Sequence, residues 1–140
     1  MNAKQYLSKL SINRLKIEQL KQQIDELEDT LCSVKAAGYS VDKVKATKSN
    51  NAYNAVDKLI DLKEETEKEI AAATEFRLRS INQIQQLSSD RYIAMLYDKY
   101  VEELEYKEIH YKTRWSYRAM FDIHKKALTE FENKFSELLQ

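Results

Sequence analysis

The chain has 140 residues, enough for one domain or for one small domain with a long helical extension. It contains one glycine, no proline and 43% apolar residues, a composition too apolar for a disordered chain and too poor in turn formers for a β-sheet protein. The formal net charge is zero, which excludes nucleic-acid binding through bulk charge and leaves only a local basic patch. The sequence therefore predicts an all-α fold.

The N-terminal residues and the cysteine content bear on location. Residues 1–15 contain no apolar run of the signal-peptide kind, and no stretch approaches the roughly 20 apolar residues of a membrane span. The single cysteine, Cys32, has no partner for an intramolecular disulfide, which fits a reducing compartment. We expect a cytoplasmic protein that does not enter a membrane.

A heptad pattern predicts a long first helix over about residues 3–37. Apolar residues recur at alternating spacings of three and four, as in a coiled-coil seam. The seam consists of Ile17, Leu20, Ile24, Leu27 and Leu31. Two arrangements fit this seam equally well. It packs either against a second helix of the same chain or against a second copy of the protein, which would form a homodimer.

The residues that follow have the composition of a loop and then the pattern of a second long helix. Gly38 is a suitable left-handed cap for the first helix, and residues 38–50 are rich in serine, asparagine and lysine without helical periodicity. A second helix is expected over about 51–87. Together the two helices predict a coiled-coil-like helical hairpin arm over residues 1–87.

Residues 88–140 predict a compact second domain of three helices. The Ser-Ser-Asp sequence at 88–90 is a break followed by a helix start, with Ser89 or Asp90 as the N-cap. Most of the large aromatic residues follow this break, so a core is expected here. The expected helices run from about Tyr92 to Leu104, around Ile109, and from Tyr117 to Leu139.

The second and third of these helices have the layout of a helix-turn-helix. The interruption between them, at 112–116, is short, and Ser116 is a good N-cap for a helix that begins at Tyr117. The spacing alone is equally compatible with two amphipathic helices crowded with aromatic residues.

The interruption and the start of the third helix are basic. Between residues 110 and 126, five basic residues stand against one acidic residue, an excess of four in a neutral chain. They are Lys112, Arg114, Arg118, Lys125 and Lys126, against Asp122. A local basic patch at the start of an exposed helix is what phosphate contacts and base-edge readout require.

The segment "DRYIAMLYDKYVEELEYKEIHYKTRWSYRAMFDIHKKALTEF" resembles the region-4-type helix-turn-helix of sigma factors. More closely, it resembles the ArpU/RinA-like transcriptional regulators of phages of low-GC Gram-positive bacteria. The matching residues are Arg91, Tyr92, Leu96, Tyr100, Val101, Glu102, Leu104, Glu108, Ile109, Ser116, Arg118, Phe121, Ile123, His124, Lys126, Ala127 and Leu128. Upstream, "DKVKATKSNNAYNAVDKLIDLKEE" is similar to the linker and second helix of that family.

The resemblance implies a phage-encoded regulator of late genes that reads double-stranded promoter DNA in the bacterial cytoplasm and contacts host RNA polymerase. By position in the motif, one set of side chains would face base edges and another would face phosphates. The first set is Tyr117, Arg118, Asp122 and Lys125, and the second is Lys112, Arg114, Ser116 and Lys126.

The chain departs from the family pattern at the turn. His110, Thr113 and Arg114 replace a small residue, a leucine and a glycine. Glycine adopts positive φ freely, so Arg114 is expected to cost about 1 kcal/mol there or to force a different turn.

No pattern in the chain indicates an enzyme. His110 and His124 are too far apart in sequence to suggest a metal site, Cys32 has no recognisable base, and no glycine-rich loop could hold a nucleotide. We therefore expect no cofactor, no metal and no small-molecule substrate.

Two alternatives to the regulator stay open. One is a helical interaction protein of a mobile element, an inhibitor or adaptor of a host protein built on a degenerate helix-turn-helix scaffold. The other is a recognition subunit for DNA packaging, which would also join a helix-turn-helix to a coiled coil.

Overall fold

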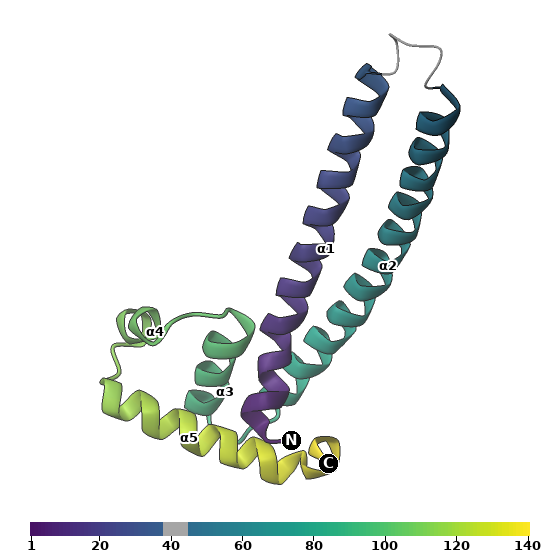
Figure 1. Cartoon of the computed structure of the whole chain (residues 1–140). Coiled ribbons are helices and arrows are strands. Elements are labelled where there is room, and N and C mark those ends of the chain that lie inside the picture. The colour runs from purple at the N-terminus through teal and green to yellow at the C-terminus, as the bar shows by residue number, and fades with distance from the viewer. Residues whose placement is uncertain (38–44) are drawn as a thin grey trace. The chain divides into compact units, whose positions relative to one another are not determined.

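A computed structural model describes the backbone of residues 1–37 and 45–140 and the side chains of residues 1–33 and 54–140. Within these residues the protein is helical and contains no strand, so the predicted all-α class is confirmed. Figure 1 shows the elements in chain order. They are α1 (Ala3–Ala37), α2 (Lys45–Gln85), α3 (Asp90–Leu96), the π-helical turn η2 (Tyr97–Val101), α4 (Tyr106–Thr113), α5 (Tyr117–Lys134) and the 3-10 turn η3 (Ser136–Leu139).

The second helix begins earlier than the sequence predicted. Because α2 starts at Lys45, the part of the expected loop from 45 to 50 is helical, and that part of the prediction is wrong. No glycine or proline stands there to interrupt a helix, and serine, threonine and asparagine each cost less than about 1 kcal/mol relative to alanine. Gly38, the expected cap, lies outside the described residues.

The chain divides into two units at places that the sequence did not indicate. The core unit comprises Met1–Arg14 together with Ala73–Gln140, and the hairpin unit comprises Leu15–Ala72. The predicted division between residues 87 and 88 does not coincide with this one. The start of α1 and the end of α2 group with the C-terminal helices rather than with an arm.

The core unit is organised around the first three turns of α1. Leu7 is fully buried there, and it belongs to a cluster that also draws on the end of α2, on α3, on η2 and on α5. The buried members of this cluster are Ala3, Tyr6, Leu7, Leu10, Ile84, Leu87, Leu96, Tyr100, Val101, Ala127, Phe131 and Leu139. Because full burial of one leucine contributes about 1.5–3 kcal/mol, the start of α1 is a large part of what stabilises this unit.

A second, smaller cluster joins α3, α4 and α5. It consists of Met95, Ile109, Met120 and Ile123, with Trp115 and Tyr106 among the half-buried residues around it. In Figure 1, α4 is seen almost along its axis while α5 lies across the view, so the two helices cross steeply. The three helices therefore share a small core of their own.

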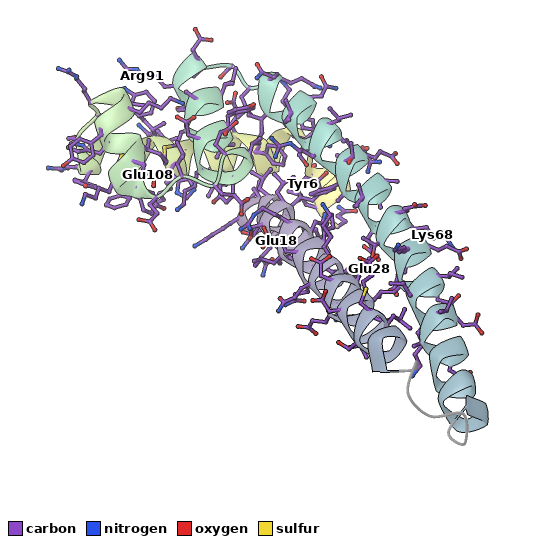
Figure 2. All side chains as sticks on the ribbon, turned by 90° about the horizontal axis from the view of Figure 1, so that it is seen from above. Tyr6, Glu18, Glu28, Lys68, Arg91 and Glu108 are labelled. Atoms are coloured by element: carbon purple, nitrogen blue, oxygen red, sulfur yellow. The ribbon has the colours of Figure 1, made fainter. Side chains whose placement is uncertain are left out.

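The hairpin unit is an antiparallel pair formed by the inner parts of α1 and α2. Two ion pairs join the helices: Lys16 Nζ lies 3.1 Å from Glu69 Oε1, and Lys63 Nζ lies 2.9 Å from Glu28 Oε1. Thr66 is buried, and its hydroxyl donates to the carbonyl of residue 62 at 2.7 Å. Figure 2 shows the polar side chains along both helices, Glu28 among them.

The residues of the predicted seam are partly shielded from solvent in the single chain. Leu20 is buried, and the other seam residues, Ile17, Ile24, Leu27 and Leu31, are half-buried. This favours the first of the two arrangements, in which the seam faces the chain's own second helix. The homodimer stays a prediction.

The burial of Leu7 generates a test of the core unit. We expect Leu7→Ala to lower the free energy of unfolding by about 2–5 kcal/mol, because the cavity that it leaves is enclosed on every side. Ile12→Ala, on the same helix but at a side chain that is 59% exposed, should change it by less than about 0.5 kcal/mol. Urea unfolding followed by circular dichroism measures both values. Equal losses for the two variants would contradict the assignment of α1 to the core.

Candidate nucleic-acid interface

The turn between α4 and α5 has a left-handed residue at its start. Arg114 is the C-cap of α4, with φ 61° and ψ 16°, and its N–H donates to the carbonyl of His110 at 2.8 Å. The family pattern has glycine at this position. Arg114 therefore takes the left-handed conformation that glycine adopts freely, at the steric cost of a Cβ in that region.

Local hydrogen bonds hold this strained turn in place. The Thr113 hydroxyl donates to the carbonyl of Ile109 at 2.7 Å and accepts the N–H of Trp115 at 3.3 Å. His110 Nδ1 donates to the Trp115 carbonyl at 2.5 Å, and the Trp115 side chain packs on the cluster that joins the three helices. Two of the three residues that depart from the family pattern, His110 and Thr113, thus stabilise the turn that the third one strains.

Ser116 begins α5 as the sequence predicted. Its backbone is extended, and its Oγ accepts the N–H of Ala119 at 3.1 Å. This cap fixes Tyr117 as the first helical residue. The hydroxyl hydrogen of Ser116 can still be donated to an outside acceptor such as a phosphate oxygen.

The two faces of α5 differ sharply. One face is buried and consists of Met120, Ile123, His124, Ala127 and Phe131. The other face carries all four side chains that the motif assigns to base edges: Tyr117, Arg118, Asp122 and Lys125 are all exposed, as is Phe121. The structure thus brings these residues together on one solvent-facing surface.

Ion pairs reduce the net charge of this surface. Lys112 Nζ lies 2.8 Å from Oδ1 of the buried Asp98, and this hydrogen bond raises the pKa of Lys112. Lys126 pairs at 3.0 Å with Asp122, one turn earlier on α5. With Asp98 included, the excess of positive charge falls from four to three.

Three cations make up this remaining excess. Arg114, Arg118 and Lys125 have no acidic partner within the part of the chain that the structure describes. They are exposed and lie at the turn and along the first turns of α5.

An aromatic group lies beside these cations, and little in the sequence pointed to it. His110 stacks on Tyr117 with ring centroids 4.6 Å apart, and Tyr117 approaches Phe121 at 6.5 Å. The exposed fractions are 43% for Tyr117, 51% for Phe121 and 72% for Tyr111. A helical spacing can exclude Phe121 from the core, but a ring stacked across two helices has no sequence signal.

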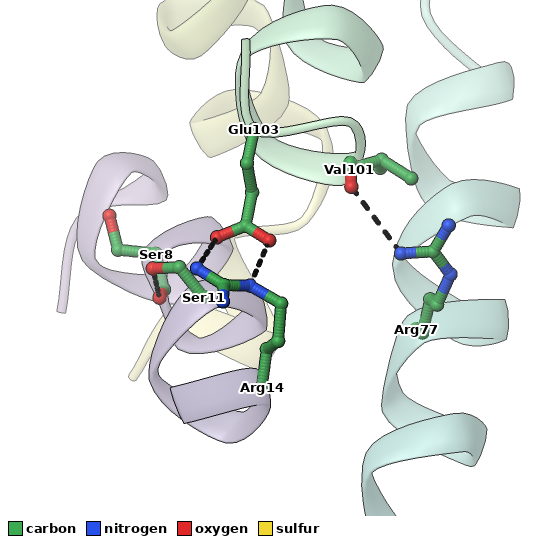
Figure 3. A network of polar contacts seen from close by, with 6 residues as sticks. All are labelled: Ser8, Ser11, Arg14, Arg77, Val101 and Glu103. Carbon is green, nitrogen blue, oxygen red and sulfur yellow. Dashed lines mark hydrogen bonds and ion pairs between the residues drawn. The ribbon is translucent and has the colours of Figure 1, made fainter. Parts of the chain in front are cut away.

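Polar contacts fix the segment that leads from η2 into α4 (Figure 3). Glu103 has φ 55°, and its carboxylate receives two hydrogen bonds from Arg14 of α1, at 2.5 and 3.0 Å. Arg77 of α2 donates to the carbonyl of Val101 at 3.3 Å. The start of α4 is then set by a capping box between Glu105 and Glu108. Residues of α1 and α2 therefore position the helix-turn-helix.

A comparison of the chain with protein-family models, curated proteins and solved structures found no match. Within the described residues, no three side chains of the metal-binding kind converge, and no helix is both long and apolar enough to cross a bilayer.

The strained turn predicts that replacing an arginine by glycine changes the free energy of unfolding in opposite directions at two positions. Arg114→Gly should raise the free energy of unfolding by about 0.5–1 kcal/mol, because glycine adopts positive φ without a steric penalty. Arg79→Gly, in the interior of α2, should lower it by about 1 kcal/mol, because glycine is a poor helix residue. Thermal and urea unfolding measure both. Destabilisation by Arg114→Gly equal to that by Arg79→Gly would show that the left-handed turn carries no strain.

Proposed function

We propose that the chain binds double-stranded DNA through α4, the turn and α5, with the start of α5 in the major groove. The observation that supports this best is the set of three cations without acidic partners among the described residues, Arg114, Arg118 and Lys125, on the exposed face of a capped helix after a helix-turn-helix turn. The major groove, about 12 Å wide, admits an α-helix.

Cations without a carboxylate partner are expected to contribute more to DNA binding than cations that already have one. Arg118 and Lys125 would reach base edges beside Tyr117, and Arg114 at the turn would contact a phosphate. Lys112 and Lys126 already have carboxylate partners, so each would release fewer counterions on binding and contribute less. Asp122 would act mainly by holding Lys126.

The resemblance extends this proposal to a biological role. A chain of this kind would regulate late genes of a phage from promoter DNA, in contact with host RNA polymerase. Only the resemblance supports that role.

The exposed aromatic group favours a second candidate, binding of a host protein. Tyrosine, phenylalanine and arginine are enriched at the centres of protein interfaces, and Tyr117 and Phe121 are exposed on α5 together with Arg118. It corresponds to the helical interaction protein that the sequence left open as an alternative. It needs the same surface as DNA, so one experiment separates the two.

Fluorescence anisotropy with a library of duplexes over a series of salt concentrations tests the proposal. Arg118→Ala should remove about 1–3 kcal/mol of discrimination between sequences. Arg114→Gly, which should not destabilise the fold, should weaken binding to all duplexes alike and reduce the salt slope by about 0.9.

Arg79→Ala is the matched control, because it removes the same charge from α2 and should change neither quantity. If the parent protein binds no duplex even below about 100 mM salt, DNA binding is excluded and the protein-interaction candidate replaces it.

A further inference from the structure

The core unit contains a half-open cleft whose lining includes none of the proposed DNA contacts. It lies between the start of α1, the segment from η2 to α4, and α5, and its volume is about 380 Å³. Its polar lining includes Lys4, Ser8, Lys99, Tyr106 and His124. Cavities of about 300–1,000 Å³ with a few convergent polar groups are the usual form of a small-ligand site.

Two lysines and two glutamates line the cleft, so its formal charges cancel, but the two signs are engaged differently. Lys4 and Lys99 have no acidic partner among the described residues, while the two carboxylates of the lining are otherwise engaged. Glu103 is held by Arg14 through two hydrogen bonds, as Figure 3 shows. Glu105 is the N-cap of α4, where the helix dipole offsets its charge. Lys99 Nζ lies over the Tyr106 ring, 4.3 Å from its centroid, and neither its ammonium group nor that of Lys4 is neutralised by a carboxylate, so both can still donate to an anion.

The buried histidine supplies a hydrogen-bond donor at the same place. His124 Nε2 lies 2.7 Å from the Tyr100 hydroxyl, and Nδ1 lies 3.4 Å from the Tyr106 hydroxyl. Burial lowers the pKa of His124, and the charges of Lys99 and Lys4 lower it further, so the imidazole is neutral at pH 7. A neutral imidazole has one N–H and one acceptor nitrogen, so only one of the two phenols can donate to it.

Burial decides which phenol donates to His124. Tyr100 is buried, and an O–H without an acceptor there would be costly, so Tyr100 donates to Nε2. The Nδ1–H of His124 then donates to the Tyr106 oxygen. The O–H of the half-exposed Tyr106 is left to donate into the cleft.

The two serines of the cleft offer hydrogen-bond acceptors, whereas Tyr106 offers a donor. Ser8 donates its hydroxyl hydrogen to the Lys4 carbonyl at 2.6 Å, and Ser11 donates to the Ser8 carbonyl at 2.9 Å. Their oxygens can therefore only accept from a ligand. A ligand that suits the whole cleft carries a dianion at one end and hydroxyl groups beside it.

We propose that this cleft binds a small phosphate monoester of a hydroxylated compound. The ammonium groups of Lys4 and Lys99 and the Tyr106 hydroxyl hold the phosphate, and the Ser8 and Ser11 oxygens accept from the hydroxyl groups. A bound ligand joins the first turns of α1 to the segment before α4, and it stabilises the core unit by an amount that grows with the logarithm of the ligand concentration above Kd.

Calorimetric titration of the full-length protein tests this site, with glycerol 3-phosphate as the probe. We expect saturable binding at one site, a smaller affinity for inorganic phosphate, and none for glycerol. Lys99→Gln and Tyr106→Phe should each weaken the affinity by about tenfold, the effect of losing one charge-assisted or donor hydrogen bond to the phosphate. Circular dichroism verifies that both variants are folded.

Lys107→Gln is the matched control, because it removes the same charge from an exposed position of α4 outside the cleft. It should leave the affinity unchanged. The proposal is overturned by any of three results: no saturable binding of millimolar glycerol 3-phosphate, equal weakening by Lys107→Gln and Lys99→Gln, or equal affinity for inorganic phosphate and the ester.

Discussion

The burial of the first three turns of α1 is the constraint on which the rest of the core unit depends. Tyr6 packs edge-on against Phe76 at 5.2 Å and lies 5.9 Å from Phe131, and its hydroxyl donates to Gln83 at 3.0 Å. Leu7 is fully enclosed beside it. Without these residues, the end of α2 and the buried face of α5 would expose apolar surface. The first and last long helices of the chain therefore stabilise one another.

Polar contacts connect this core to the segment that leads into α4 and to α4 itself. Arg77 donates to the last residue of η2 and Arg14 to Glu103 just after it, and Lys112 ties α4 to Asp98 inside that π-helical turn. Exposed pairs contribute about 1 kcal/mol or less, but removal of Lys112 would leave a buried carboxylate unpaired, which is far more costly. Lys112 is thus first a structural residue. The cations at the start of α5, with no such task, are those available for a ligand.

Local signals in the sequence were sufficient for some of these features. Ser116 predicted the start of α5 because an N-cap needs only the next turn, and the absence of proline predicted an all-α chain. The packing of Tyr6 against Phe131 joins residues far apart in sequence, so no local pattern could predict it. The Lys112–Asp98 pair likewise crosses a loop, so a count of charges overestimated the free cations.

Native-state hydrogen exchange tests the central claim, that the start of α1 and α5 form one cooperative body. Amides of residues 6–10 in α1 and 123–131 in α5 should exchange with the same free energy of opening, equal to that of global unfolding of the core unit. They should also respond alike to added urea. If residues 6–10 open at a clearly lower free energy than 123–131, the start of α1 belongs to a separate arm, and the claim of one cooperative body is wrong.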